Sequence, residues 1–117
     1  MINYFAPEEF KCGCGCGRMA VNPKLVEKLN KAREFYDGPI HINSGYRCPE
    51  WNQQVGGKPD SAHLYGMATD LKCQNSRDRF SLINALLQAG FNRIGIATSF
   101  IHCDMDGTKP SGVIWLY

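Results

Sequence analysis

A stretch rich in glycine and proline, from Ser44 to Gly66, separates the regular parts of the chain. Glycine and proline interrupt helices and strands, so we predict an irregular segment here, apart from one short helix around residues 50–55. A loop of this length in a compact protein is usually functional or disordered. With 44% hydrophobic and 21% charged residues, the composition is that of an ordinary globular protein. The 117 residues are therefore expected to form one domain, 1–117, that contains this long loop.

Two amphipathic helices are predicted on either side of the loop. The first covers residues 22–37, where Asn22 is a good N-cap. The second covers residues 76–89, with Ser76 as its cap. The core-facing stripe of this second helix is expected to consist of Phe80, Ile83 and Leu87.

Five short runs are predicted to be strands, at residues 39–43, 67–73, 93–97, 100–105 and 113–117. Only two residues separate the third and fourth runs, which favours a hairpin turn. The last run can add an edge strand. The order of helices and strands predicts an α+β fold with a small antiparallel sheet backed by helices.

Charge and hydropathy exclude several classes of partner. The net charge of +2 and the scattered Lys and Arg residues do not indicate a nucleic-acid-binding protein. No apolar run approaches the roughly 20 residues that a membrane-spanning helix needs. The first residues lack the basic and apolar regions of a secretory signal, so we expect a protein that is cytoplasmic as synthesised. We also expect a monomer.

Three of the six cysteines alternate with glycine near the start of the chain, at Cys12, Cys14 and Cys16. They are candidate ligands for a soft metal ion, together with a fourth cysteine. In an oxidising medium they could form disulfides instead, and in a reducing one they could be free thiols. The sequence leaves these three alternatives open, and the fourth ligand would be one of Cys48, Cys73 and Cys103.

Candidate ligands for a catalytic metal ion lie after the loop. A turn at Gly66 that leads into a strand would fold His63 back over Asp70. His102 lies in a later strand and would supply a third ligand, which leaves one coordination position open for water. A histidine in an apolar strand is also compatible with a hydrogen-bonded core residue, so spacing alone leaves both readings open.

These residues form motifs that resemble a known family. The motifs are Ser61-x-His63-x-x-Gly66-x-Ala68-x-Asp70, the downstream run Phe100-Ile101-His102-Cys103-Asp104 and the upstream run Ser44-Gly45-Tyr46-Arg47-x-x-x-x-Asn52. In this order they resemble the zinc D-Ala-D-Ala carboxypeptidase family, which includes L-Ala-D-Glu endolysins of bacteriophages and shares a hedgehog-like fold. The short single-domain branch of phages and prophages, which has a similar cysteine-rich opening, is the most similar. The resemblance extends from about Phe5 to Trp115.

The resemblance implies a zinc peptidase. His63, Asp70 and His102 would bind Zn²⁺, and a zinc-activated water would hydrolyse a peptide bond in bacterial peptidoglycan. The enzyme would be of the D,D-carboxypeptidase or murein endopeptidase type. Its substrate would be a stem peptide or cross-link that contains a D-amino acid, and its site of action would be the bacterial cell wall.

The resemblance also suggests roles for residues around the metal. Arg47 would anchor a substrate carboxylate or stabilise the oxyanion, because its planar fork donates two hydrogen bonds. Ser61 would bind substrate or orient His63, although a serine that only caps a turn fits equally well. Tyr46 and Tyr65 are expected to line the substrate groove.

One position departs from the family pattern. Many relatives have a Glu or Asp as general base three residues before the last zinc histidine, where this chain has Ser99. Asp104 is the nearest carboxylate on the same strand face as that histidine, so it is expected to be the base or to hold the zinc ligands in place. Asp60 and Asp106 are weaker candidates, expected in solvated turns. The missing carboxylate also keeps an alternative open, a non-catalytic zinc-stabilised module that binds cell wall or a partner protein.

Overall fold

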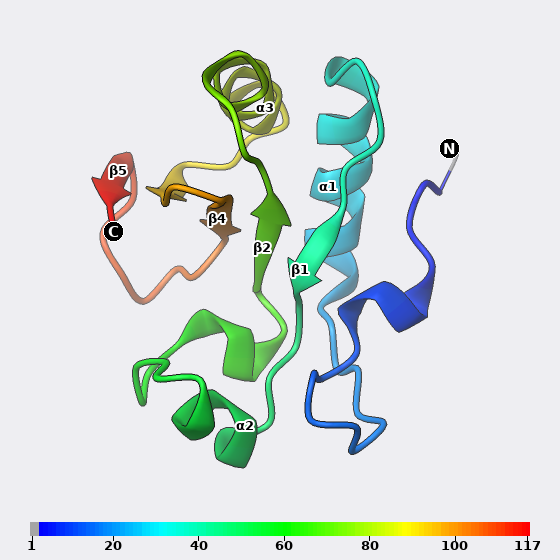
Figure 1. Cartoon of the computed structure of the whole chain (residues 1–117), viewed down its shortest axis with the longest axis vertical. Coiled ribbons are helices and arrows are strands. Elements are labelled where there is room, and N and C mark those ends of the chain that lie inside the picture. The colour runs from blue at the N-terminus through cyan, green and yellow to red at the C-terminus, as the bar shows by residue number, and fades with distance from the viewer. Residues whose placement is uncertain (1–2) are drawn as a thin grey trace.

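The computed structural model describes residues 3–117 and consists of a mixed sheet with two helices packed on one face (Figure 1). Five strands are found within these residues, in the order β1-β2-β4-β3-β5. Their bounds are Ile42–Ser44 for β1, Ala68–Lys72 for β2, Arg93–Ile96 for β3, Phe100–Asp104 for β4 and Val113–Leu116 for β5. The helices are α1 at Pro23–Phe35, α2 at Pro49–Gln54 and α3 at Ser76–Gln88, with short 3₁₀ helices η1 at Pro7–Phe10 and η2 at Ala62–Tyr65.

The predicted α+β fold is confirmed, and one strand pairing differs from the prediction. Strands β1, β2, β4 and β3 pair antiparallel to their neighbours, whereas β5 pairs parallel to β3. The eight-residue link 105–112 carries the chain past β3 so that β5 enters the sheet edge in the same direction. The sheet is therefore mixed.

The main core lies between the sheet and the helices α1 and α3. Alternate strand residues face the helices, because side chains along a strand point to opposite faces. The fully buried members of this core include Leu25 and Leu29 of α1, Leu82 and Leu86 of α3, and Leu71, Ile94 and Ile101 of the strands. The other sheet face is left free of these helices.

Helix α3 corrects two details of the sequence prediction. Its N-cap is Asn75, whose side-chain oxygen accepts a hydrogen bond from the Asp78 backbone N–H at 2.9 Å. The expected stripe is also rotated, since Phe80 is 76% exposed and Leu87 is 49% exposed. The buried stripe is Leu82, Ala85 and Leu86. Both stripes have helical spacing, so periodicity alone could not choose between them.

None of the helices described in residues 3–117 combines the length and apolar character needed to cross a membrane.

Candidate metal centre

The pairing of β2 with β4 sets three polar side chains on the sheet face opposite the helices. Asp70 lies directly opposite His102 across this antiparallel pair, and Ala68 lies opposite Asp104. Directly opposite residues share a face, and so do residues two apart along one strand. The register thus brings Asp70, His102 and Asp104 together, and their neighbours Thr69, Leu71 and Cys103 are turned toward the core.

His63 reaches the same face from η2, just before β2. Ser61 caps this short helix by accepting a hydrogen bond from the His63 backbone N–H at 3.2 Å. Gly66 ends it in the left-handed region, at φ 67°, where a Cβ would also lie 2.0 Å from the carbonyl oxygen of Ala20. The chain thereby reverses, and His63 Nε2 comes to 3.3 Å from Asp70 Oδ1.

The hydrogen bond on the other side of the His63 ring fixes its tautomer. His63 Nδ1 lies 2.7 Å from the carbonyl oxygen of Gly45, which can only accept, so Nδ1 carries the proton. Nε2 then presents a lone pair. This atom is fully buried and has no hydrogen-bond partner among the described residues, and the nearby oxygen of ionised Asp70 is also an acceptor. Two acceptors that face each other in a buried site fit the ligand set of a cation.

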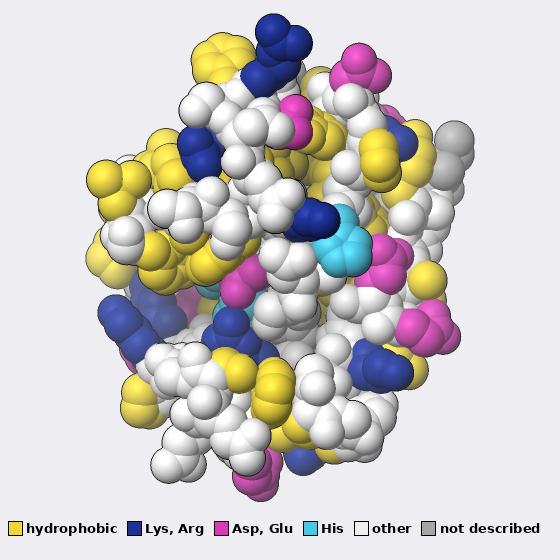
Figure 2. Space-filling view, viewed as in Figure 1, with side chains coloured by type: hydrophobic (Ala, Val, Ile, Leu, Met, Phe, Trp, Pro, Cys, Tyr) yellow, Lys and Arg dark blue, Asp and Glu magenta, His cyan; other side chains and the backbone are white. Residues whose placement is uncertain are grey.

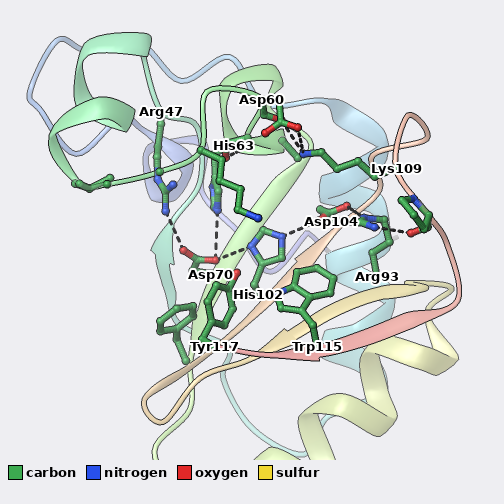
Figure 3. Close-up of a pocket in the computed structure, with 18 residues that line it drawn as sticks. Arg47, Asp60, His63, Asp70, Arg93, His102, Asp104, Lys109, Trp115 and Tyr117 are labelled. Atoms are coloured by element: carbon green, nitrogen blue, oxygen red, sulfur yellow. Dashed lines mark hydrogen bonds and ion pairs between the residues drawn. The ribbon is translucent and has the colours of Figure 1, made fainter.

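His102 repeats this arrangement on β4. Its Nε2 lies 2.7 Å from Asp104 Oδ2 and its Nδ1 lies 2.9 Å from Asp70 Oδ1 (Figure 3). In its neutral form, the form that binds a metal ion, His102 has one proton; when Nε2 donates it to Asp104, the Nδ1 lone pair faces Asp70. The structure thus brings together one ligand atom each from His63, Asp70 and His102, all within 4.8 Å of one another. Two imidazoles and a carboxylate suit zinc, and we call this group the sheet centre.

Arg47 holds the other oxygen of Asp70. Its Nη2 donates to Asp70 Oδ2 at 3.1 Å, and its Nη1 and Nε donate to Asn52 Oδ1 and Ser44 Oγ, each at 3.2 Å. Asn52 is buried, and its own side-chain amide donates to the carbonyl oxygen of Lys58, which fixes its position. The guanidinium leaves Asp70 Oδ1 directed at the two histidines. The motif that runs from Ser44 to Asn52 is therefore one hydrogen-bonded unit.

Arg93 and Trp115 complete the opposite side, and the sequence analysis assigned a role to neither of them. Arg93 Nε donates to Asp104 Oδ1 at 2.8 Å, and its guanidinium lies 5.0 Å from the ring centre of Trp115. Trp115 also approaches the His102 ring, with 5.5 Å between ring centres. Gly95 makes this possible, because a Cβ there would lie 2.6 Å from Trp115 Nε1. The one sequence signal for Arg93 was an arginine at the start of a predicted apolar strand.

Electrostatics keep both carboxyls ionised. Burial alone would raise the pKa of Asp70, but the hydrogen bond with His102 outweighs it, and the pKa lies well below its usual range. Burial would likewise raise the pKa of Asp104, and hydrogen bonds from His102 and the Asp106 backbone N–H lower it instead. The pKa of His102 is raised above its ordinary value: burial acts against this, but the bonds to Asp104 and Asp70 outweigh it. Asp70 is therefore ionised and presents an anionic oxygen to the two imidazoles.

The sheet centre lies at the floor of a cavity of about 700 Å³. Figure 2 shows acidic and histidine side chains inside a hollow on this face, with Lys and Arg side chains beside it. The predicted residues Arg47 and Ser61 line the cavity, as do Arg93, Lys109 and Tyr117, which the sequence analysis did not select. Its volume is in the usual range for a small-ligand site.

Other predicted positions lie elsewhere. Tyr46 is buried against Cys12 and Cys48, and Tyr65 is 64% exposed; neither lines the cavity, and their groove role stays a prediction. Ser99 is exposed in the link between β3 and β4. Asp106 is buried rather than solvated, since it accepts hydrogen bonds from Thr108 and pairs with Lys109 at 3.2 Å.

Comparison with known proteins agrees with this geometry. Residues 3–104 match the family model described as Peptidase M15. The chain belongs to the peptidase M15 family. Over 58 residues it is also 40% identical to the zinc D-Ala-D-Ala carboxypeptidase of Streptomyces albus G. That match covers 50% of this chain and 22% of the relative, so the chain spans only about a fifth of the relative's length.

Proposed function

We propose that this member of the M15 family is a zinc-dependent peptidase that hydrolyses a peptide bond in bacterial peptidoglycan. The observation that carries the proposal is the meeting of two histidine lone pairs and a carboxylate oxygen at the floor of a cavity. The printed name of the Streptomyces relative, a zinc D-Ala-D-Ala carboxypeptidase, supports both the metal and the class of substrate.

His63, Asp70 and His102 would hold the zinc ion. When bound there, zinc supplies a Lewis acid that activates water and polarises a carbonyl group. The residues around it fix the ligands: the Gly45 carbonyl accepts from His63 Nδ1, and Arg47 holds the second oxygen of Asp70. Each ligand atom is thereby presented with its lone pair toward the same point.

The sequence left two roles open for Asp104, general base or support of a zinc ligand. We propose that it supports the ligand His102. Its Oδ2 pairs with His102 Nε2, and its Oδ1 accepts from Arg93 Nε and from the Asp106 backbone N–H. A carboxylate with three such donors is a poor proton acceptor, because each bond stabilises its ionised form. Asp104 then selects the His102 tautomer that leaves Nδ1 free.

The positive charges of the cavity wall favour a substrate that carries a carboxylate. The guanidinium groups of Arg47 and Arg93 and the ammonium group of Lys109 belong to its lining. Arg47 lies beside Asp70 and would anchor a substrate carboxylate or stabilise a developing oxyanion, as the motif implies. Ser61 lines the same wall, where its hydroxyl could also meet the substrate backbone. A stem peptide that ends in a D-amino acid fits these requirements.

Peptide release from purified peptidoglycan tests the proposal. Zinc-loaded protein is incubated with sacculi, and the soluble products are analysed by mass spectrometry beside a chelated sample and a sample to which zinc is restored. We expect fragments that vanish with the chelator and return with zinc. Their masses name the bond and so separate a D,D-carboxypeptidase from a murein endopeptidase of the phage lysin kind.

One observation favours a second candidate, the non-catalytic module. Ser99 is exposed where relatives have a base, and the oxygens of Asp104 are engaged with donors. A zinc-bound, folded protein that pulls down with sacculi and releases no fragment supports this module and contradicts the peptidase.

A further inference from the structure

A second group of candidate metal ligands lies outside the sheet centre. Cys12, Cys14 and Cys16 belong to the N-terminal loop, and Cys48 is the residue just before α2. In Figure 1 this loop, in blue, runs beside α2. The four sulfur atoms all lie within 4.8 Å of one another. We call these four residues the cysteine cluster.

We propose that the cysteine cluster binds a structural zinc ion. A tetrahedral site with Zn–S bonds of about 2.3 Å has sulfur atoms about 3.8 Å apart. The Sγ atoms of Cys12 and Cys14 are 3.5 Å apart, and those of Cys14 and Cys48 are 3.7 Å apart. Disulfide sulfurs lie about 2.05 Å apart, and each of the six cysteines is unbridged. These two separations match thiolates around one ion, and Cys16 Sγ lies within 4.8 Å of the other three sulfurs.

The loop has the backbone that such a site requires. Gly15 and Gly17 adopt left-handed conformations, at φ 84° and 81°, which lets the chain turn between Cys14 and Cys16 and again after Cys16. Gly13 lies against the Trp51 indole, where a Cβ would be 2.9 Å from Nε1. The Cys12 N–H donates to the carbonyl oxygen of Arg18 at 2.8 Å and closes the loop.

Backbone donors also point at the inner sulfurs. The Cys48 N–H donates to Cys12 Sγ at 3.3 Å, and the Trp51 N–H donates to Cys48 Sγ at 3.4 Å. Such bonds support a thiolate, and zinc sites commonly use them to orient their ligands. Cys12 and Cys48 are buried whereas Cys14 and Cys16 are exposed, so an ion can enter from the loop side.

The cluster connects the N-terminal loop to the segment that carries Arg47. Cys48 follows Arg47 directly, and the Tyr46 N–H donates to the Phe10 carbonyl oxygen at 2.9 Å. A zinc ion here would fix the backbone from which Arg47 reaches Asp70. This inference stands on the sulfur geometry and is independent of the proposed peptidase function.

Metal content and cobalt absorption test the second site. The full chain is prepared with zinc and a phosphine reductant. The number of zinc ions per chain is then measured by inductively coupled plasma mass spectrometry. We expect two ions in the wild type, one in Cys14→Ser/Cys16→Ser and one in Asp70→Asn. Cys73→Ser, which changes a cysteine outside the cluster, is the matched control and keeps two.

Cobalt replaces zinc as the spectroscopic probe. Thiolate ligands give Co²⁺ an intense near-ultraviolet charge-transfer band that histidine and carboxylate ligands do not give. We expect this band in the wild type and in Asp70→Asn, and its loss in Cys14→Ser/Cys16→Ser, whose fold is checked by circular dichroism. A wild type without the band, with its four thiols free or oxidised to disulfides by intact mass, overturns the proposal. If only the sheet centre fails to bind metal, the thiolate band is still observed. The failure of the proposed peptidase site can therefore be distinguished from the failure of the cysteine site.

Discussion

The sheet centre and the cysteine cluster hold their candidate ligands by different means. Asp70 and His102 face each other on paired strands, and each is fixed by hydrogen bonds to a second side chain. The cluster takes three of its four ligands from a loop whose shape depends on glycine turns. Regular backbone hydrogen bonds between strands place Asp70 and His102, whereas the cluster depends on glycine turns and on a few hydrogen bonds with the segment around Cys48.

This difference separates two uses of a metal ion. A centre built on a sheet is preorganised, so removing its ion leaves the scaffold folded and stops the chemistry. A cluster built on a loop gains its order from the ion, so removing the ion loosens the structure. The variants below test this contrast, from the largest expected effect to the smallest.

Asp70→Asn is expected to have the largest effect on activity. The amide keeps the shape of the side chain but loses the charge that faces the two histidines. Losing the metal removes several kcal/mol of transition-state stabilisation, so peptide release should fall by about 10³-fold or more. Product quantification by mass spectrometry measures the fall. Zinc content at the sheet centre that equals the wild type would contradict the assignment of Asp70, and His63→Ala and His102→Ala extend the test.

Two variants of Asp104 separate positioning from base catalysis. Asp104→Ala removes the acceptor for His102 Nε2, so zinc affinity and turnover should fall by about 10–100-fold. Asp104→Asn keeps an acceptor oxygen and should recover a large part of that loss. A general base would behave differently, because Asn would then be as inactive as Ala while zinc affinity stayed at the wild-type value. Competitive chelator titration measures the affinity.

The sheet centre was accessible to sequence analysis because strands have a simple period. Alternation on the strand 67–73 put Asp70 on one face, and the glycine at position 66 predicted the reversal that returns His63. The motifs supported His102 as the third ligand, but the pairing of its strand with residues 67–73 was not predicted. Two helical stripes of equal spacing were available on α3, and the wrong one was chosen because the choice depends on tertiary packing.

Long-range contacts explain what the sequence could not give. Cys48, Cys73 and Cys103 were equal candidates for the fourth cluster ligand, and only the fold separates them: Cys73 and Cys103 belong to the main core. Arg93 and Trp115 meet because a parallel strand returns beside β3, a pairing that no local pattern encodes. The predicted groove tyrosines were chosen by their closeness in sequence to motif residues, which does not fix the direction of a side chain.

Gly95→Ala tests how tightly the sheet places the site. The new methyl group would lie 2.6 Å from Trp115 Nε1 and 2.7 Å from the Tyr117 ring, so both rings must move off the strand. Overpacking of this kind lowers the free energy of unfolding by about 1–3 kcal/mol. Chemical denaturation measures it. Gly107→Ala is the matched control, because nothing lies within 4 Å of its added methyl. Equal stability of the two variants would show that the Trp115 and Tyr117 rings can move away from position 95 without loss of stability.

Arg47→Lys changes the residue that contacts Asp70 of the sheet centre and directly precedes Cys48 of the cysteine cluster. A lysine cannot donate at once to Asp70, Asn52 and Ser44, so Asp70 loses its fixed orientation. We expect turnover to fall about 10-fold, which corresponds to one charged hydrogen bond, with the melting temperature nearly unchanged. Arg77→Lys, at an exposed position on α3, controls for the substitution itself. An unchanged rate in Arg47→Lys would make Arg47 a bystander.

Cys14→Ser/Cys16→Ser should have the smallest effect on turnover and a visible one on stability. None of the four cysteines lines the cavity, so activity is lowered only through the backbone that carries Arg47. We expect a loss of a few-fold in turnover, together with a melting temperature lower by about 5 °C, the shift that roughly 1 kcal/mol produces in a chain of this size. Calorimetry of the zinc-loaded proteins measures this. If the double variant instead lost turnover as completely as Asp70→Asn while keeping its melting temperature, the cluster would belong to the chemistry and the contrast between the two regions would be wrong.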